Sequence, residues 1–98
     1  MPLETLPFDS AQHLKTQEDI ALYLQAVLEE NDPALFCHAL GQVARAKGMT
    51  QLARETGLAR EALYRALSAE GNPELATIMK VMKALGVHLS VEPAQAGA

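Results

Sequence analysis

Apolar residues recur at helical spacing in five stretches of this 98-residue chain. Positions three and four apart lie on one face of an α-helix, so each stretch would present an apolar face to a core. Ala and Leu dominate the composition, which favours packed helices over strands. We therefore predict an all-α fold with five helices, over about residues 17–30, 33–47, 51–56, 60–68 and 74–85.

The predicted core consists of the apolar positions on the inner face of each helix. They are Ile20, Tyr23, Leu24, Val27, Leu28, Phe36, Ala39, Leu40, Val43, Ala44, Leu52, Leu58, Leu63, Leu67, Leu75, Ile78, Met79, Met82 and Leu85. A domain of this size has a small core and is only modestly stable by itself.

The helix boundaries follow from capping residues. A side-chain oxygen at the N-cap accepts a hydrogen bond from a backbone N–H of the first turn. We predict Thr16, Asp32, Thr50 and Asn72 as the N-caps of the first, second, third and fifth helices. Ala59 precedes the fourth helix and has no such oxygen, so that helix should begin without a side-chain cap.

Residues 50–68 form the stretch around which the chain is organised, with two short helices joined by a tight turn at Gly57. Glycine tolerates the positive φ that such a turn often requires. The second helix would expose a polar face, which consists of Arg60, Glu61, Tyr64, Arg65 and Ser68. A short polar face with two arginines suits the major groove of DNA. The spacing fits an ordinary helical hairpin with a solvated face equally well.

Both ends of the chain differ from this helical middle. Residues 1–15 contain two prolines and no sustained periodicity, so we predict an extended arm ahead of a helix-turn-helix domain over residues 16–92. Apolar and polar residues alternate over residues 87–92, which predicts a short C-terminal β-strand. That strand would have to pair with the arm, with a second copy or with a partner. Residues 93–98 are predicted to be a disordered tail.

The charge of the chain is unevenly distributed. Its formal net charge of −4 argues against a nucleic-acid binder. Residues 1–40, however, hold one basic and seven acidic residues, whereas residues 41–68 hold five basic and two acidic ones. The positive charge thus concentrates on the helix-turn-helix stretch, and the acidic remainder suits a basic partner.

The sequence gives little support for catalysis, a metal site or a cofactor. Cys37 and His38 are adjacent, but neighbours on a helix point about 100° apart and do not face each other. The three histidines are scattered, and no glycine-rich phosphate loop occurs. We therefore expect a protein that is not an enzyme and binds no cofactor. The lone cysteine, with no signal peptide and no apolar run of membrane length, predicts a cytoplasmic protein.

The residues from Gly48 to Ser68 read GMTQLARETGLAREALYRALS, and GNPEL at 71–75 and KVMKALGV at 80–87 follow them. This run resembles an Xre/Cro-type helix-turn-helix. More narrowly, it resembles the addiction-module antidote proteins, the HigA-like antitoxins that are encoded next to a RelE/HigB-type toxin. The similarity covers about nine-tenths of the chain and departs from the family at Ala59, where the family often has Ser.

The resemblance implies a type II antitoxin with two activities. It would bind a palindromic operator as a dimer and repress its own operon, and it would neutralise by direct binding a toxin that degrades messenger RNA. The DNA-binding residues that the resemblance implies are Thr50, Gln51, Arg60, Glu61, Tyr64, Arg65 and Asn72. Glu61 and Arg65 are four residues apart and could equally pair with each other.

We expect the toxin contact in the acidic residues 1–40. An RNA-cleaving partner should be basic, and Leu3, Leu6 and Phe8 offer apolar anchors on the arm. The same arm could instead cover the last helix or pair with the C-terminal strand in a dimer. A different function also stays open, namely an interaction module that keeps the helix-turn-helix fold without binding DNA. The acidic net charge favours that alternative.

Overall fold

The computed structural model describes residues 16–94, and these contain five α-helices and no β-strand. The helices are α2 (Gln17–Leu28), α3 (Pro33–Lys47), α4 (Met49–Thr56), α5 (Arg60–Ala66) and α6 (Leu75–Ala84). The all-α prediction with five helices is confirmed. The predicted arm over residues 1–15 and the tail beyond residue 94 lie outside the described residues. None of the helices in the described part is long and apolar enough to cross a membrane.

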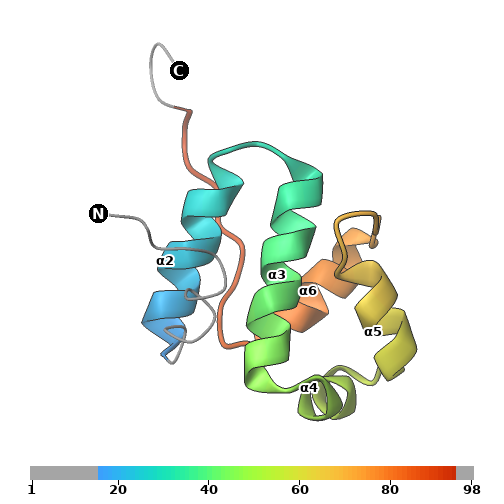
Figure 1. The fold of residues 1–98 in the computed structure, drawn as a ribbon. Coiled ribbons are helices and arrows are strands. Elements are labelled where there is room, and N and C mark those ends of the chain that lie inside the picture. Colours follow the sequence, from blue (N-terminus) through green and yellow to red (C-terminus); the bar gives the residue numbers. More distant parts are fainter. Residues whose placement is uncertain (1–15, 95–98) are drawn as a thin grey trace.

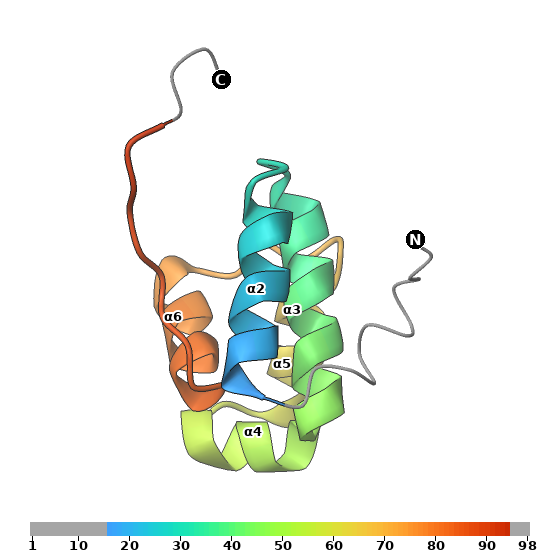
Figure 2. The ribbon, with the colours of Figure 1, turned by 90° about the vertical axis from the view of Figure 1, so that its left-hand side faces the viewer.

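The helices surround a single apolar core. Helices α2 and α3 stand side by side, and α4 crosses below them (Figure 1). Helix α4 contacts α3, α5 and α6, and it therefore links the α2–α3 pair to the remaining two helices. Figure 2 shows α2 in front and α5 behind, and in Figure 1 α6 lies behind α3. This arrangement leaves one long side of α5 open to solvent.

Each helix supplies at least one side chain to the core cluster. Leu24, Leu40, Leu52, Leu63 and Val81 come from the five helices in order, and all are almost fully buried. Burying a side chain of this kind stabilises the fold by roughly 1.5–3 kcal/mol relative to leaving it exposed. The small residues predicted as close contacts in α3, Ala39 and Ala44, are also buried.

Two of the predicted N-caps are confirmed. Thr16 Oγ1 accepts a hydrogen bond from the backbone N–H of Asp19 at 3.0 Å. Asp32 Oδ1 accepts from the N–H groups of Ala34 and Leu35 at 3.1 and 3.2 Å. These bonds satisfy donors that the first turn of a helix leaves without an intrahelical partner.

The N-caps predicted at Thr50 and Asn72 are wrong. Helix α4 begins one residue before Thr50, at Met49, because Gly48 adopts a φ of 119° and the Met49 side chain turns into the core. Helix α6 begins at Leu75 after Glu74, whose side chain makes no capping bond. Asn72 stays in the preceding loop, which folds back so closely that a Cβ at Gly71 would collide with backbone carbonyls at the end of α5.

Three predicted core residues are instead exposed. Leu28 at the end of α2 is 42 % exposed, and Leu75 and Met79 on α6 are 64 % and 55 % exposed. Helix α6 buries Ile78, Val81 and Met82, with Leu85 buried just after it, and a helix can turn only one stripe towards a core. Leu75 and Met79 lie outside that stripe, whereas Val81, which the prediction left out, is fully buried, so the predicted apolar face of α6 was displaced around the helix axis.

The predicted C-terminal strand is not confirmed, because no strand forms within residues 16–94. Residues 87–94 run without a helix or a strand ladder past α6 (Figure 2). The backbone N–H of Val87 donates to the carbonyl of Met82 at 3.0 Å, which fixes the start of this segment. A strand needs a neighbour for its backbone groups, and nothing in residues 16–94 provides one. The alternating pattern was correctly read, but the ladder it requires is absent from the described residues.

Candidate nucleic-acid interface

A tight turn between α4 and α5 determines how α5 is presented. Gly57 has φ 78° and ψ 10°, which confirms the predicted positive φ. Its N–H donates to the carbonyl of Ala53 at 2.9 Å and so closes the end of α4. The left-handed conformation disfavours any residue with a Cβ, although the space around Gly57 is empty.

Thr56 reinforces this turn in a way that the sequence reading missed. Its hydroxyl donates to the carbonyl of Leu52 at 2.8 Å and accepts from the N–H of Leu58 at 3.3 Å. The hydroxyl thus joins the last turn of α4 to the residue that leads into α5. Threonine often bonds to nearby backbone groups in turns, so its place directly before the glycine was the available signal.

Helix α5 is short and is anchored to the core by buried leucines on its inner side. It has seven residues, and Ala59 gives it no side-chain cap, as predicted. Leu63 within the helix and Leu67 just after it are buried in the core. These two anchors fix the helix because its own hydrogen bonds are too few to stabilise it alone.

The outward side of α5 carries four of the five polar residues that the sequence predicted there, whereas Ser68 lies beyond the helix and is half-buried. Arg60, Glu61, Tyr64 and Arg65 are all exposed. The guanidinium carbon of Arg60 lies 5.8 Å from the centroid of the Tyr64 ring, within range of a cation–π contact. No ion pair joins Glu61 to Arg65 in residues 16–94, so both side chains point to solvent without binding each other.

The remaining predicted DNA-binding residues lie at the two ends of this surface. Thr50 and Gln51 are exposed in the first turn of α4, where Gln51 Nε2 donates to Glu55 Oε2 at 3.0 Å. Asn72 is exposed in the loop after α5 and lines a hollow together with Arg65. The fold thus brings Asn72 next to α5, whereas no hydrogen bond or ion pair within the described residues links Thr50 or Gln51 to that helix.

Charge separates the two sides of the described structure. Exposed basic residues cluster around α4 and α5, namely Lys47, Arg54, Arg60 and Arg65. Exposed acidic residues mark the two ends of α2 and the start of α3, including Glu18, Glu29, Glu30 and Asp32. The one ion pair among the described residues, Lys47 Nζ to Glu55 Oε1 at 3.9 Å, is exposed and contributes little. Together with the exposed Glu55 and Glu61, these four basic residues give residues 47–66 a formal net charge of +2, which suits a polyanion.

Cys37 and His38 point apart on α3. Cys37 is buried, and this burial raises the pKa of its thiol, whereas His38 is exposed. A buried neutral thiol is a poor nucleophile. No group of three or more His, Cys, Asp or Glu side chains in residues 16–94 is placed to hold a metal ion.

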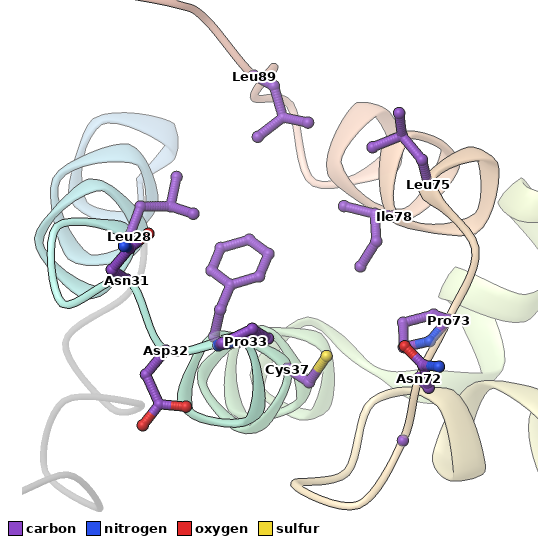
Figure 3. Close-up of a pocket in the computed structure, with 12 residues that line it drawn as sticks. Leu28, Asn31, Asp32, Pro33, Cys37, Asn72, Pro73, Leu75, Ile78 and Leu89 are labelled. Carbon is purple, nitrogen blue, oxygen red and sulfur yellow. The ribbon is translucent and has the colours of Figure 1, made fainter. Parts of the chain in front are cut away.

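A second hollow lies between the end of α2, the start of α3 and α6, and Asn72 lines it as well as the hollow beside Arg65. Figure 3 shows Leu28 on one wall, Leu75 and Ile78 on the opposite wall, and Leu89 above them. Phe36 and Cys37 also line the hollow. Sequence reasoning missed it because Leu28 and Leu75 were assigned to the core, and their place at the edge of the apolar stripes was the signal.

The residues predicted to bind the partner, Leu3, Leu6 and Phe8, lie outside the described residues. Their placement on an extended arm therefore stays a prediction, as does their part in toxin binding.

Comparison with known proteins identifies the family. A family model described as "Probable addiction module antidote protein" matches residues 4–93. An uncharacterized protein from Haemophilus influenzae is 52 % identical over 85 residues, which cover 87 % of this chain and 88 % of the relative. No solved structure matches the chain. The chain therefore belongs to the family of probable addiction module antidote proteins, and membership of that family implies a cognate toxin as its partner.

Proposed function

We propose that this antidote is a DNA-binding antitoxin with an Xre/Cro-type helix-turn-helix in α4 and α5. It binds operator DNA as a dimer, represses its own operon and neutralises by direct binding a RelE/HigB-type toxin that degrades messenger RNA. The observation that carries the DNA-binding part is the exposed polar face of α5. Two arginines and a tyrosine project from a short helix whose opposite side is anchored by Leu63 and Leu67.

The side chains on α5 match the chemistry of base edges in the major groove. Arginine donates two hydrogen bonds to guanine, and glutamate accepts from the amino group of cytosine. In the proposed complex Arg60, Glu61, Tyr64 and Arg65 form the base-reading face, with the guanidinium of Arg60 over the ring of Tyr64. Thr50, Gln51 and Asn72 contact the strands at the two edges of the groove.

A seven-residue helix reads only a few base pairs. Two copies of the chain on a palindrome double that number, with half-sites about one helical turn, roughly 34 Å, apart. Dimeric binding thus follows from the shortness of α5.

The toxin takes a different surface in this proposal. The acidic residues of α2 and the start of α3 attract a basic RNA-cleaving protein, and Leu3, Leu6 and Phe8 anchor it. Separate surfaces allow one antitoxin to hold the toxin and the operator together.

A mobility shift on the DNA upstream of the gene tests the DNA-binding part. Arg65→Ala should weaken operator binding by about 1–3 kcal/mol and change binding to unrelated DNA much less. Arg45→Ala is the matched control, because it removes the same charge from α3, outside the proposed contacts. If the wild-type chain does not shift its own upstream DNA, the alternative function of an interaction module without DNA binding is correct.

Deletion of residues 1–15 tests the toxin contact. We expect toxin neutralisation to be lost while operator binding is retained. Neutralisation that survives the deletion would place the contact elsewhere. Loss of the dimer on deletion would mean that the arm belongs to the antitoxin's own assembly.

A further inference from the structure

Exposed apolar side chains gather around α6 and the segment that follows it. Leu75 and Met79 lie one turn apart on α6. Leu89, in the segment after the helix, lies beside a hollow with each of them. Leu89 lines the hollow of Figure 3 with Leu28 and Leu75, and it lines a second hollow with Met79. We call these four residues, Leu28, Leu75, Met79 and Leu89, the α6 face. Because Leu89 lines both hollows, it joins these exposed apolar side chains into one candidate contact surface.

The backbone beside the α6 face lacks partners within the described chain. After the bond from Val87 to Met82, no backbone hydrogen bond involves residues 88–94 within residues 16–94. Val91 is 97 % exposed, although it is apolar and β-branched. Val87, Leu89 and Val91 alternate with polar residues, as one side of a strand would. The backbone of residues 87–92, the C-terminal segment, therefore forms no strand within residues 16–94 but is available to pair with one.

Two copies of the C-terminal segment can pair antiparallel so that apolar residues face apolar residues. In an antiparallel pair centred on Leu89, each Leu89 faces its own copy, and Val87 faces Val91. All three apolar side chains then lie on one side of the two-stranded ribbon. Glu92, the only charged residue of the segment, falls opposite Gly86, so no like charges meet. Such a pair has the two-fold symmetry that most homodimers have.

We propose that a second copy of this chain covers the α6 face, with the two C-terminal segments paired antiparallel across the two-fold axis. Leu75 and Met79 of each copy then pack against the partner's ribbon. Helix α5 lies away from this segment in both ribbon views, so the polar face of α5 stays open in the dimer (Figures 1 and 2). This inference rests on the proposed function only for the expectation that the chain dimerises.

A crosslinking experiment on the full chain tests the register. Cys37→Ala removes the lone cysteine, and Leu89→Cys then places a thiol on the two-fold axis, directly opposite its copy. We expect Leu89→Cys to form a disulfide-linked dimer under mild oxidation. His88→Cys is the matched control, because residue 88 faces residue 90 and not itself. Crosslinking at residue 88 but not at residue 89 would overturn the proposed pairing.

Measuring the oligomeric state of variants tests whether a second copy covers the α6 face. Sedimentation equilibrium should give a dimer for the wild type, and Val91→Glu should raise its dissociation constant by about tenfold or more. Leu22→Glu is the control, because Leu22 is a 66 % exposed leucine on α2 that lines none of the hollows around Leu89. Val91 is so exposed that its substitution should leave the circular dichroism spectrum and the Tm of the monomer unchanged.

Three results would overturn the inference. One is a wild type that stays monomeric at high concentration, and another is a dimer that is insensitive to Val91→Glu and disappears when residues 1–15 are deleted. The third is a Val91→Glu variant that keeps its dimer and loses toxin binding, which would assign the face to the toxin. A wild-type dimer that fails to bind its operator would instead refute the proposed function and leave this inference intact.

Discussion

Helices α5 and α6 present opposite kinds of surface to solvent. Both are anchored by nearly fully buried aliphatic side chains, Leu63 in α5 and Val81 in α6. On their outward sides, α5 carries arginines and a tyrosine, whereas α6 carries the apolar Leu75 and Met79 beside two exposed lysines, Lys80 and Lys83. A polar face is stable in water without a partner, but each exposed leucine forgoes roughly 1.5–3 kcal/mol of burial. The contrast therefore indicates a charged ligand for α5 and a protein partner for α6.

Two leucines give the largest expected contrast. Leu63→Ala should lower the free energy of unfolding by about 2–5 kcal/mol, because it leaves a cavity under α5. Leu75→Ala should cost less than about 0.5 kcal/mol in the Val91→Glu background, where dimer formation makes no contribution. Urea unfolding measures both. Equal effects would mean that the outward side of α6 is part of the monomer's own core.

Arg60→Ala should affect only operator binding, the function proposed for α5, and not the dimer contact proposed for α6. We expect a loss of about 1–3 kcal/mol in operator binding, with no change in the dimer dissociation constant. Titrations at several salt concentrations check the mode of binding, because phosphate contacts release counterions and weaken as salt rises. Binding that is independent of salt would rule out the proposed contacts between α5, its flanking residues and the DNA.

Gly57→Val should destabilise the turn that positions α5, because valine does not readily adopt the backbone conformation of Gly57. The φ of 78° costs a residue with a Cβ about 1–2 kcal/mol, and a β-branched side chain suits it especially poorly. Gly57→Asn is the control, since asparagine tolerates this conformation better. Thermal unfolding measures both variants, and an unchanged Tm for Gly57→Val would mean that the turn has another conformation.

Asp32→Ala should have a smaller effect than Gly57→Val and should leave DNA binding unaltered. It removes the two capping bonds at the start of α3, next to the α6 face, and should cost about 1 kcal/mol of stability. Asp32→Asn keeps an acceptor oxygen and should cost less. A specific loss of dimer without loss of stability would show that Asp32 acts in the interface and not as a cap.

The sequence predicted those features of the fold that depend on a few neighbouring residues. The caps at Thr16 and Asp32 and the positive φ at Gly57 need only a side chain and the adjacent backbone. The outward face of α5 was predicted for a similar reason, because helical periodicity alone separates Leu63 from Arg60 and Arg65.

The predictions that are wrong or not confirmed concern residues whose environment is set by distant parts of the chain. Thr50 is displaced from the N-cap because burial of Met49 starts α4 one residue earlier. Asn72 stays in a loop that packs back onto the end of α5, and so does not cap α6. The strand over residues 87–92 has no neighbour in the described chain, although its alternating pattern was plain.

The sequence by itself thus determined five helices, the αL turn at Gly57 and the charge difference between the α4–α5 region and the rest, because local propensity and periodicity govern these properties. Only the tertiary structure decided which apolar residues are covered. A helix can carry more apolar residues than a small core has room for, and the relative placement of α2, α3 and α6 excludes Leu28, Leu75 and Met79 from it. That exclusion creates the α6 face beside the C-terminal segment.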